Sequence, residues 1–312
     1  MSAPKPSTPR DNGQQSVYRE IHLSTGETLR IGAHAYGATV VEGLQPAILA
    51  AVASGALPAL HIKNAVSIQW CDLVSDRFTR HPATMKEDVL PPIYSLGSHL
   101  YSCPTGESFS YYFQRIEQSN AAIAEILPNG WDPIVSFLKD ACELGGSRFE
   151  YLSANGLSIR HGSFRTWGKD SGSTADGRCY FAAPHEDYEE TNSNHPLPQI
   201  YQSNNVFSII LCIDAVHDCE PETIVWNQRM TLDEISDPNI RHSWASYGYR
   251  ESLFQDVDSM LIRLKKGDAA IIPAHNVHAV IGYSGFQWCT YMAFFHLIEP
   301  TPTGFSKLVF RT

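Results

Sequence analysis

The second half of the chain is a succession of short β-type segments, and this pattern limits the folds open to it. Each segment is rich in β-branched or aromatic residues, and Gly, Asp, Asn or Pro separates it from the next. Short strands with frequent turns are typical of all-β sandwiches and barrels, and this set predicts a jelly roll or the related double-stranded β-helix. The segments are 157–167, 178–184, 206–214, 222–227, 259–264, 269–273, 278–283 and 287–297.

The first half has a different pattern and predicts helical support with a few strands, so the fold class is α+β and mainly β. Short β-like runs occur before residue 41, and prolines at intervals make us expect an irregular stretch over 64–103. Three helices are predicted from their helix-forming residues, apolar period and end signals, at 44–53, 107–126 and 132–144.

With 312 residues, 43% of them hydrophobic, the chain can bury the core of one large domain. We expect residues 1–15, which are polar and rich in Pro and Ser, to form a disordered tail rather than a signal peptide. Residues 16–312 then form a single domain. Its parts are a supporting region at 16–150, the jelly-roll core at 151–297 and a C-terminal segment at 298–312.

Charge and cysteine usage narrow the class of partner. A formal net charge of -10 argues against nucleic acid and anionic membranes, so the expected partner is a small molecule, with a homodimer left open. Seven cysteines without a CxxC pair suggest reduced thiols in the cytoplasm. The group Cys212, His217 and Cys219 has too few donors, at irregular spacing, for a structural zinc site.

Two of the predicted strands carry candidate metal ligands. His185 and Asp187 are two residues apart at the end of one strand, so they point to the same face and leave Glu186 on the other. His278 opens a later strand and can supply a third ligand. Two histidines and a carboxylate on one face form the triad of mononuclear non-haem iron(II) oxygenases.

Other interpretations of the same residues stay open at this point. Pro184 and the acidic run after it also suit a solvated turn, in which His185 and Asp187 bind nothing. His275 competes with His278 for the ligand role, although strand parity allows only one of the two to face inward.

A wider pattern around these residues resembles a known family. His185-x-Asp187, a long gap, and then Gly267-Asp268 before an apolar strand with His278 eleven residues after the glycine resemble the iron(II)/2-oxoglutarate-dependent oxygenases. The resemblance is to the small-molecule branch, similar in layout to its aliphatic halogenases, over about 150–297. It implies the double-stranded β-helix fold, iron(II) held by the triad, and 2-oxoglutarate and O2 as cosubstrates. The implied reaction is hydroxylation, desaturation or cyclisation at an unactivated C–H bond in specialised metabolism. Halogenation is disfavoured, since the halogenases lack the carboxylate that Asp187 provides.

The chain departs from the family in its anchor for 2-oxoglutarate. Family members usually hold the distal carboxylate with Arg or Lys shortly after the second histidine, but the last predicted strand has no cation. Gln287 and Thr290 lie there and can only hydrogen-bond. We therefore expect an arginine from another strand, with Arg165 first, Arg160 second and Arg229 third. Arg160 and Arg165 are five apart, so at most one faces the barrel.

The missing cation keeps two other functions open. One is an iron oxygenase of the same fold that does not use 2-oxoglutarate. The other is a cupin-like metal or ligand-binding protein that is not an oxygenase. The sequence does not identify the substrate.

Overall fold

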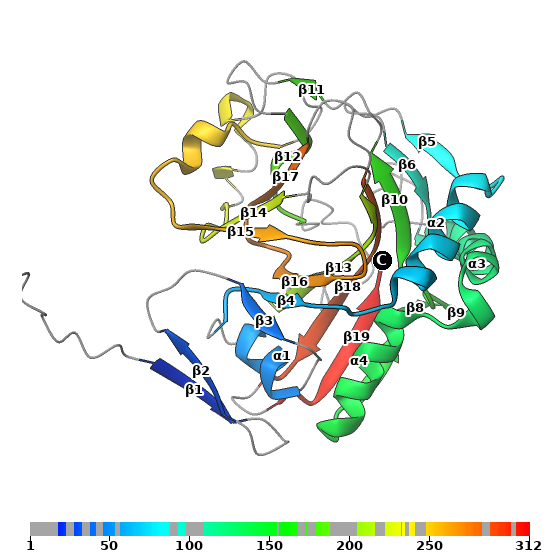
Figure 1. Ribbon diagram of the computed structural model, residues 1–312, viewed down its shortest axis with the longest axis horizontal. Helices are drawn as coiled ribbons and strands as arrows, with labels where there is room; N and C mark the ends of the chain where they lie inside the picture. Colours follow the sequence, from blue (N-terminus) through cyan, green and yellow to red (C-terminus); the bar gives the residue numbers. More distant parts are fainter. Residues whose placement is uncertain are drawn as a thin grey trace, which may run out of the picture.

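The computed structural model describes the chain from residue 18 to its end, apart from several intervening segments (Figure 1). The predicted tail at 1–15 is outside the described part. The described residues are 18–22, 28–32, 38–41, 46–53, 57–87, 93–97, 109–154, 156–167, 172–173, 179–187, 205–215, 222–231, 233–234, 237–240, 248–282, 288–300 and 304–312.

Two sheets face each other and form the core of the fold. In the larger sheet, the long strands β13 and β18 pair antiparallel at the centre, and β19 and β7 extend the sheet from β18. The order of the main path is β3 (Thr39–Val41), β4 (Leu60–Ile62), β16 (Ala269–Pro273), β13 (Val206–Ala215), β18 (Trp288–Ile298), β10 (Ser163–Trp167), β6 (Ile93–Leu96) and β5 (Met85–Glu87). The added strands are β19 (Lys307–Arg311) and β7 (Arg148–Tyr151).

The smaller sheet carries the candidate metal ligands. Figure 1 shows it to the left of β10 and β18. Its order is β11 (Gly172–Ser173), β12 (Cys179–His185), β17 (His278–Gly282), β14 (Glu222–Trp226) and β15 (Ser259–Arg263). All its pairs are antiparallel. Two hairpins lie apart from both sheets: β1 (Tyr18–His22) with β2 (Thr28–Gly32), and β8 (Ser153–Ala154) with β9 (Leu157–Ser158).

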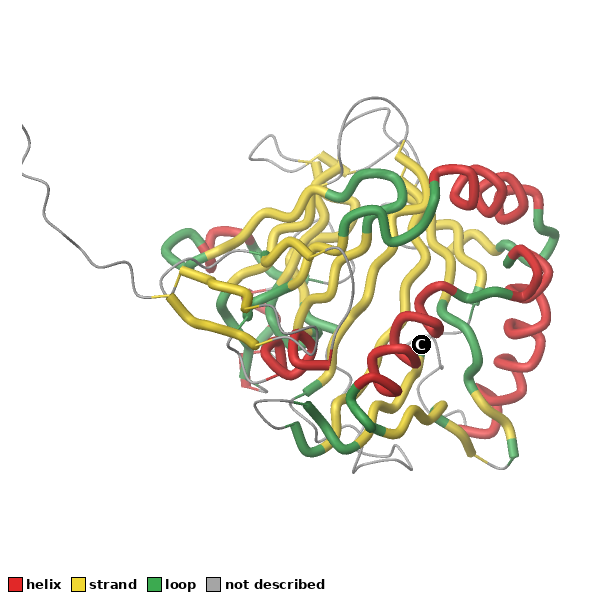
Figure 2. Tube along the Cα trace, turned by 60° about the horizontal axis from the view of Figure 1, so that its bottom comes forward, coloured by secondary structure: helices red, strands yellow, loops and turns green. Residues whose placement is uncertain are grey.

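Helices cover the outer face of the larger sheet (Figure 2). Their apolar side chains share one cluster with alternate residues of β13 and β18, such as Ile209 and Phe295. The helices are α1 (Pro46–Ala53), α2 (Ile68–Arg80), α3 (Phe109–Ile126) and α4 (Pro133–Leu144), with single 3-10 turns η2 (Pro128–Gly130), η3 (Pro238–Ile240) and η4 (Glu251–Phe254). None of the described helices is both long and apolar enough to cross a lipid bilayer.

The space between the sheets is a second apolar core, built from strand residues of opposite parity. Ile210 and Met292 of the larger sheet meet Phe181 and Val225 of the smaller sheet there. Strand side chains alternate between faces, so polar residues of the same parity also point inward. On β10 this places Arg165 on the inner face, since its neighbour Trp167 belongs to the inner cluster.

The double-stranded β-helix and the helical support predicted from the sequence are therefore confirmed, and each of the eight predicted segments contains a strand of the two sheets. The expectation of an irregular stretch over 64–103 is wrong. Ser67 accepts a hydrogen bond from the amide of Trp70 and starts α2, and the prolines that suggested irregular chain come after its last turn. Strands β5 and β6 follow in the same stretch.

The prediction of one continuous strand over 157–167 is also wrong. This segment is divided into β9 and β10, because the amide of Arg160 donates to the side chain of Asn120 on α3 instead of to a strand.

Burial of the thiols agrees with the expectation of reduced cysteines. The free and buried cysteines in the described part of the chain are Cys71, Cys142, Cys212 and Cys289. Burial raises the pKa of Cys71, Cys142 and Cys212 to about 12, so these thiols are protonated at neutral pH.

Candidate metal centre

The structure brings His185, Asp187 and His278 to one point. One ligand atom from each lies within 4.8 Å of the other two. His185 Nε2 is 3.7 Å from Asp187 Oδ1, and His278 Nε2 is 3.4 Å from Asp187 Oδ2. The cross-strand pairing of β12 with β17 explains the meeting, since His185 and His278 are direct partners in its register.

Backbone carbonyls orient both imidazole rings. His185 Nδ1 is 2.6 Å from the carbonyl oxygen of Ala183, and His278 Nδ1 is 2.9 Å from that of Asn276. A carbonyl only accepts, so each ring carries its proton on Nδ1 and turns Nε2 toward Asp187. Two Nε2 lone pairs and a carboxylate converging in this way form a donor set for a cation.

Asp187 is itself held at both its backbone and its side chain. Its amide donates to the carbonyl of Ala274 at 2.9 Å, and its Oδ2 accepts from Ser208 Oγ at 2.9 Å. Ser208 lies on the inner face of β13 among apolar neighbours, and its hydroxyl fixes the carboxylate.

The charges at the site favour an ionised carboxylate beside a neutral imidazole. Burial and the neighbouring His278 lower the pKa of His185 to about 4, and the positive charge of Arg165 adds to this. Burial also opposes ionisation of His278, but the charge of Asp187, and the hydrogen bond that Nε2 donates to it when the ring is protonated, raise the pKa of His278. Burial acts against the Asp187 carboxylate as well, yet the two histidines and Ser208 hold its pKa well below the ordinary value.

Arg165 lies within electrostatic range of this site and points into the same interior. Its cross-strand partners are Thr290 on β18 and Ser95 on β6, both buried and on the same inner face. The hydroxyls of Thr290 and its diagonal neighbour Ser163 are buried and have no hydrogen-bond partner among the described residues. The stacked rings of Trp167 and Trp288, with centroids 4.8 Å apart, lie next to them on the inner face.

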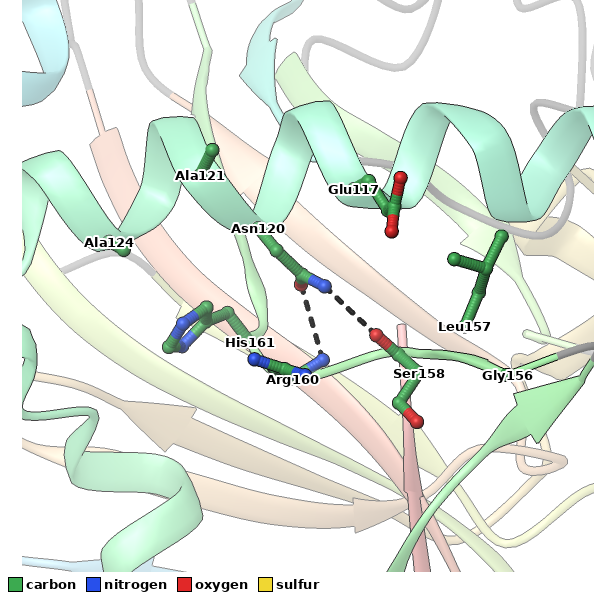
Figure 3. A pocket seen from close by; sticks show the side chains of 9 residues that line it. All are labelled: Glu117, Asn120, Ala121, Ala124, Gly156, Leu157, Ser158, Arg160 and His161. Carbon is green, nitrogen blue, oxygen red and sulfur yellow. Dashed lines mark hydrogen bonds between the residues drawn. The ribbon is translucent and has the colours of Figure 1, made fainter.

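The other two candidate arginines lie elsewhere. Arg160 is exposed and lines a pocket of about 340 Å³ between α3 and residues 156–161, on the helix side of the larger sheet (Figure 3). Arg229 is exposed beyond the end of β14, and its Nε donates to Asn276 Oδ1 at 3.2 Å. It thus lies beside the segment that carries His278, at the rim of the site.

Of the remaining candidate site residues, one faces the interior beside Arg165 and the others do not join the site among the described residues. Thr290 points inward beside Arg165, whereas Gln287 is outside the described residues. His275 is buried but is not part of the three-residue cluster. The sequence reasoning did not single out Ser208 or Ser163. A serine within an apolar strand such as 206–213 is the signal that could have found the first of them.

Known structures share this architecture. An N-substituted L-amino acid dioxygenase from Burkholderia ambifaria AMMD, solved in complex with alpha-KG, superposes with a TM-score of 0.52 at 13% identity, covering 90% of this chain and 94% of that chain. A second structure under the same protein name gives a TM-score of 0.54 at 14% identity with the same coverage. The fold is shared. Identities this low show the fold alone; no protein-family model matches the sequence, and no curated protein matches it either.

Proposed function

We propose that this protein is a non-haem iron(II) oxygenase that uses 2-oxoglutarate and O2 to oxidise an unactivated C–H bond of a small molecule. The observation that carries the proposal is the convergence of His185, Asp187 and His278, with both Nδ1 atoms bonded to carbonyls. Two imidazoles and one carboxylate suit iron(II) and leave coordination positions for other ligands.

The residues present fit iron(II). Asp187 is ionised, and His185 is neutral at pH 7 because its pKa is lowered to about 4. The side chains of His185 and Asp187 are 21% and 16% exposed, so an ion can reach a site whose third member, His278, is buried. Ser208 donates its hydroxyl to Asp187 and so keeps the carboxylate in position to bind the metal.

The barrel interior also fits the distal carboxylate of 2-oxoglutarate. Arg165 supplies the charge that the last strand lacks, and the buried hydroxyls of Thr290 and Ser163 supply donors next to it. A buried carboxylate without a cation costs several kcal/mol, so an arginine from β10 is a physical equivalent of one from β18. The fold is shared with a dioxygenase solved with alpha-KG, the same compound, which supports this assignment.

Each group then has a defined task. His185, Asp187 and His278 hold the metal, and Arg165 with Thr290 orients the cosubstrate toward it. The apolar inner cluster, including Phe181 and Met292, excludes water from the interior. Iron(II), when bound, would supply the oxidising chemistry: 2-oxoglutarate releases CO2 and takes one oxygen atom of O2 to become succinate, while the other oxygen atom either enters the C–H bond as a hydroxyl group or leaves as water with two substrate hydrogens in desaturation or cyclisation. Hydroxylation, desaturation and cyclisation are all compatible with this site.

The test is iron-dependent conversion of 2-oxoglutarate to succinate by the purified protein, with O2 uptake recorded in parallel. We expect succinate from wild type with iron(II), and none from Asp187→Ala or after chelation of the metal. O2 uptake without succinate would indicate an iron oxygenase with another cosubstrate. Metal binding with neither signal, across a panel of small-molecule substrates, would indicate a cupin-like binding protein.

A further inference from the structure

The end of β12, where His185 is the last strand residue and Asp187 follows two residues later, is supported by a segment from elsewhere in the chain. β11 pairs only with Cys179 and Tyr180 at the start of β12. Pairing of β12 with β17 is irregular between Ala182 and His185. Within the described residues, the two neighbouring strands therefore leave the last part of β12 without a regular ladder on either side.

Residues 248–250 pack against this part of β12. The amide of Tyr249 donates to the carbonyl of Pro184 at 2.6 Å. Gly248 has φ +92, and a Cβ there would lie 2.8 Å from Pro184 O and 2.9 Å from the Cβ of Ala183. Only glycine fits this approach, because both the conformation and the lack of space exclude a side chain.

The side chain of Tyr249 makes a second contact with the same strand end. It is fully buried, and its hydroxyl donates to Glu186 Oε1 at 2.6 Å. Glu186 follows the last residue of β12, and its partner Tyr249 packs with Tyr180 and Ala279 on the face of the smaller sheet opposite to the inner cluster. A bond that holds Glu186 on the outer face therefore keeps its two neighbours turned toward the inside.

We infer that Tyr249 is a positioning residue for the metal centre, acting through Pro184 and Glu186 on His185 at the end of β12 and on Asp187 just beyond it. The inference rests on the proposed function, since it concerns the same metal. Hydrogen bonds that orient ligands from outside the coordination sphere typically change metal affinity by about 10- to 100-fold. Tyr249 bonds to Glu186, which adjoins both ligands, and to Pro184, which adjoins His185, so we expect an effect near the lower end of that range.

The chain contains a matched control for this role. Tyr180, at the far end of β12, donates its hydroxyl to Glu251, which follows Tyr249 by two residues. Both tyrosines are buried, both donate to a glutamate, and both join β12 to the 248–254 segment. They differ in their distance along the strand from His185 and Asp187.

The experiment measures cobalt(II) binding to the purified apoprotein by calorimetry, with urea unfolding of the same samples. Tyr249→Phe should weaken cobalt(II) binding roughly tenfold or more, whereas Tyr180→Phe should stay within about twofold of wild type, the effect of a bond remote from the ligands. Glu186→Gln keeps an acceptor for Tyr249 but removes a charge that also acts on His278, so it measures the effect of the charge alone. Glu186→Ala removes the acceptor as well and should bind cobalt(II) roughly tenfold more weakly than Glu186→Gln, which gives a second measurement if Tyr249→Phe does not fold.

Equal weakening in Tyr249→Phe and Tyr180→Phe would overturn the inference, because the effect would then be loss of general stability. So would wild-type affinity in both Tyr249→Phe and Glu186→Ala, with the metal centre left intact. A wild-type protein that binds no cobalt(II) would instead refute the metal centre and, with it, the proposed function.

Discussion

Arg165→Gln removes a positive charge from the inner face of the barrel and keeps a shorter side chain that still hydrogen-bonds. Arg165 is half-buried, and its inner-face neighbours Ser163, Trp167, Thr290 and Ser95 are at most 5% exposed, so water screens its charge only in part. A hydrogen bond to a charged group contributes roughly 1.5–3 kcal/mol, and each 1.4 kcal/mol corresponds to about a tenfold change in affinity. We therefore expect 2-oxoglutarate to bind Arg165→Gln roughly 10- to 150-fold more weakly.

The assay is anaerobic titration of the iron(II)-loaded protein with 2-oxoglutarate, followed by calorimetry or by visible absorption of the chelate. Iron(II) affinity is measured on the same variant and should not fall, since Arg165 repels the metal rather than binding it. Arg160→Gln is the control, because Arg160 is exposed on the helix side of the larger sheet. This variant should bind 2-oxoglutarate as wild type does. Arg229→Gln tests the rim of the site.

Wild-type binding of 2-oxoglutarate by Arg165→Gln would refute the assignment of the anchor to β10. A loss confined to Arg229→Gln would move the anchor to the rim beside Asn276. If all three variants bind as wild type does, the distal carboxylate is held without an arginine from this set.

Three further predictions concern the metal, the reaction and the stability of the fold. His278→Ala should lose iron(II) while His275→Ala keeps it, as measured by metal analysis after desalting. The opposite result would mean that His275, and not His278, is the metal ligand. In chloride buffer, wild type should form an oxidised product and no chlorinated one by mass spectrometry, and Asp187→Ala should be inactive without added halide; chlorination by wild type would contradict the role of Asp187. Asp268→Asn should lower the free energy of unfolding at pH 7 by roughly 1–3 kcal/mol. Burial acts to raise the pKa of Asp268, but hydrogen bonds from His61 and the amides of Asn64 and Lys265 lower it below 3.8. The stabilisation that ionised Asp268 gives the fold is therefore complete at pH values above its pKa in the unfolded chain, and it disappears as the pH falls through its lower pKa in the folded protein. The free energies of unfolding of wild type and Asp268→Asn, measured by urea titration, should therefore converge in acid. A constant difference between the two at all pH values would contradict this.

Local sequence patterns were enough for the architecture and for the face on which each candidate ligand lies. Strand side chains alternate with period two, which predicted a shared face for His185 and Asp187, and the two side chains do converge although β12 ends at His185. Turn residues between short apolar segments limited the second half to a sandwich or barrel. These patterns depend only on residues that are close in the sequence, so they can be recognised without knowledge of the tertiary contacts.

Helix α2 shows where local patterns were insufficient. The prolines after residue 81 suggested irregular chain, and the burial that stabilises the helix comes from its contact with β13, far along the chain. Packing of one apolar face contributes more to a helix of this length than intrinsic propensity does.

The contents of the site were decided by long-range pairing. Parity allowed either Arg160 or Arg165 to face the barrel, but only the register of β10 with β18 places Arg165 beside Thr290. Likewise, the pairing of β12 with β17 makes His185 and His278 partners across 93 positions of sequence. The contacts of Ser208 with Asp187 and of Tyr249 with Glu186 also join distant segments. A sequence determines which face a strand residue occupies, whereas the residues it meets there depend on strand register, which only the assembled sheets specify.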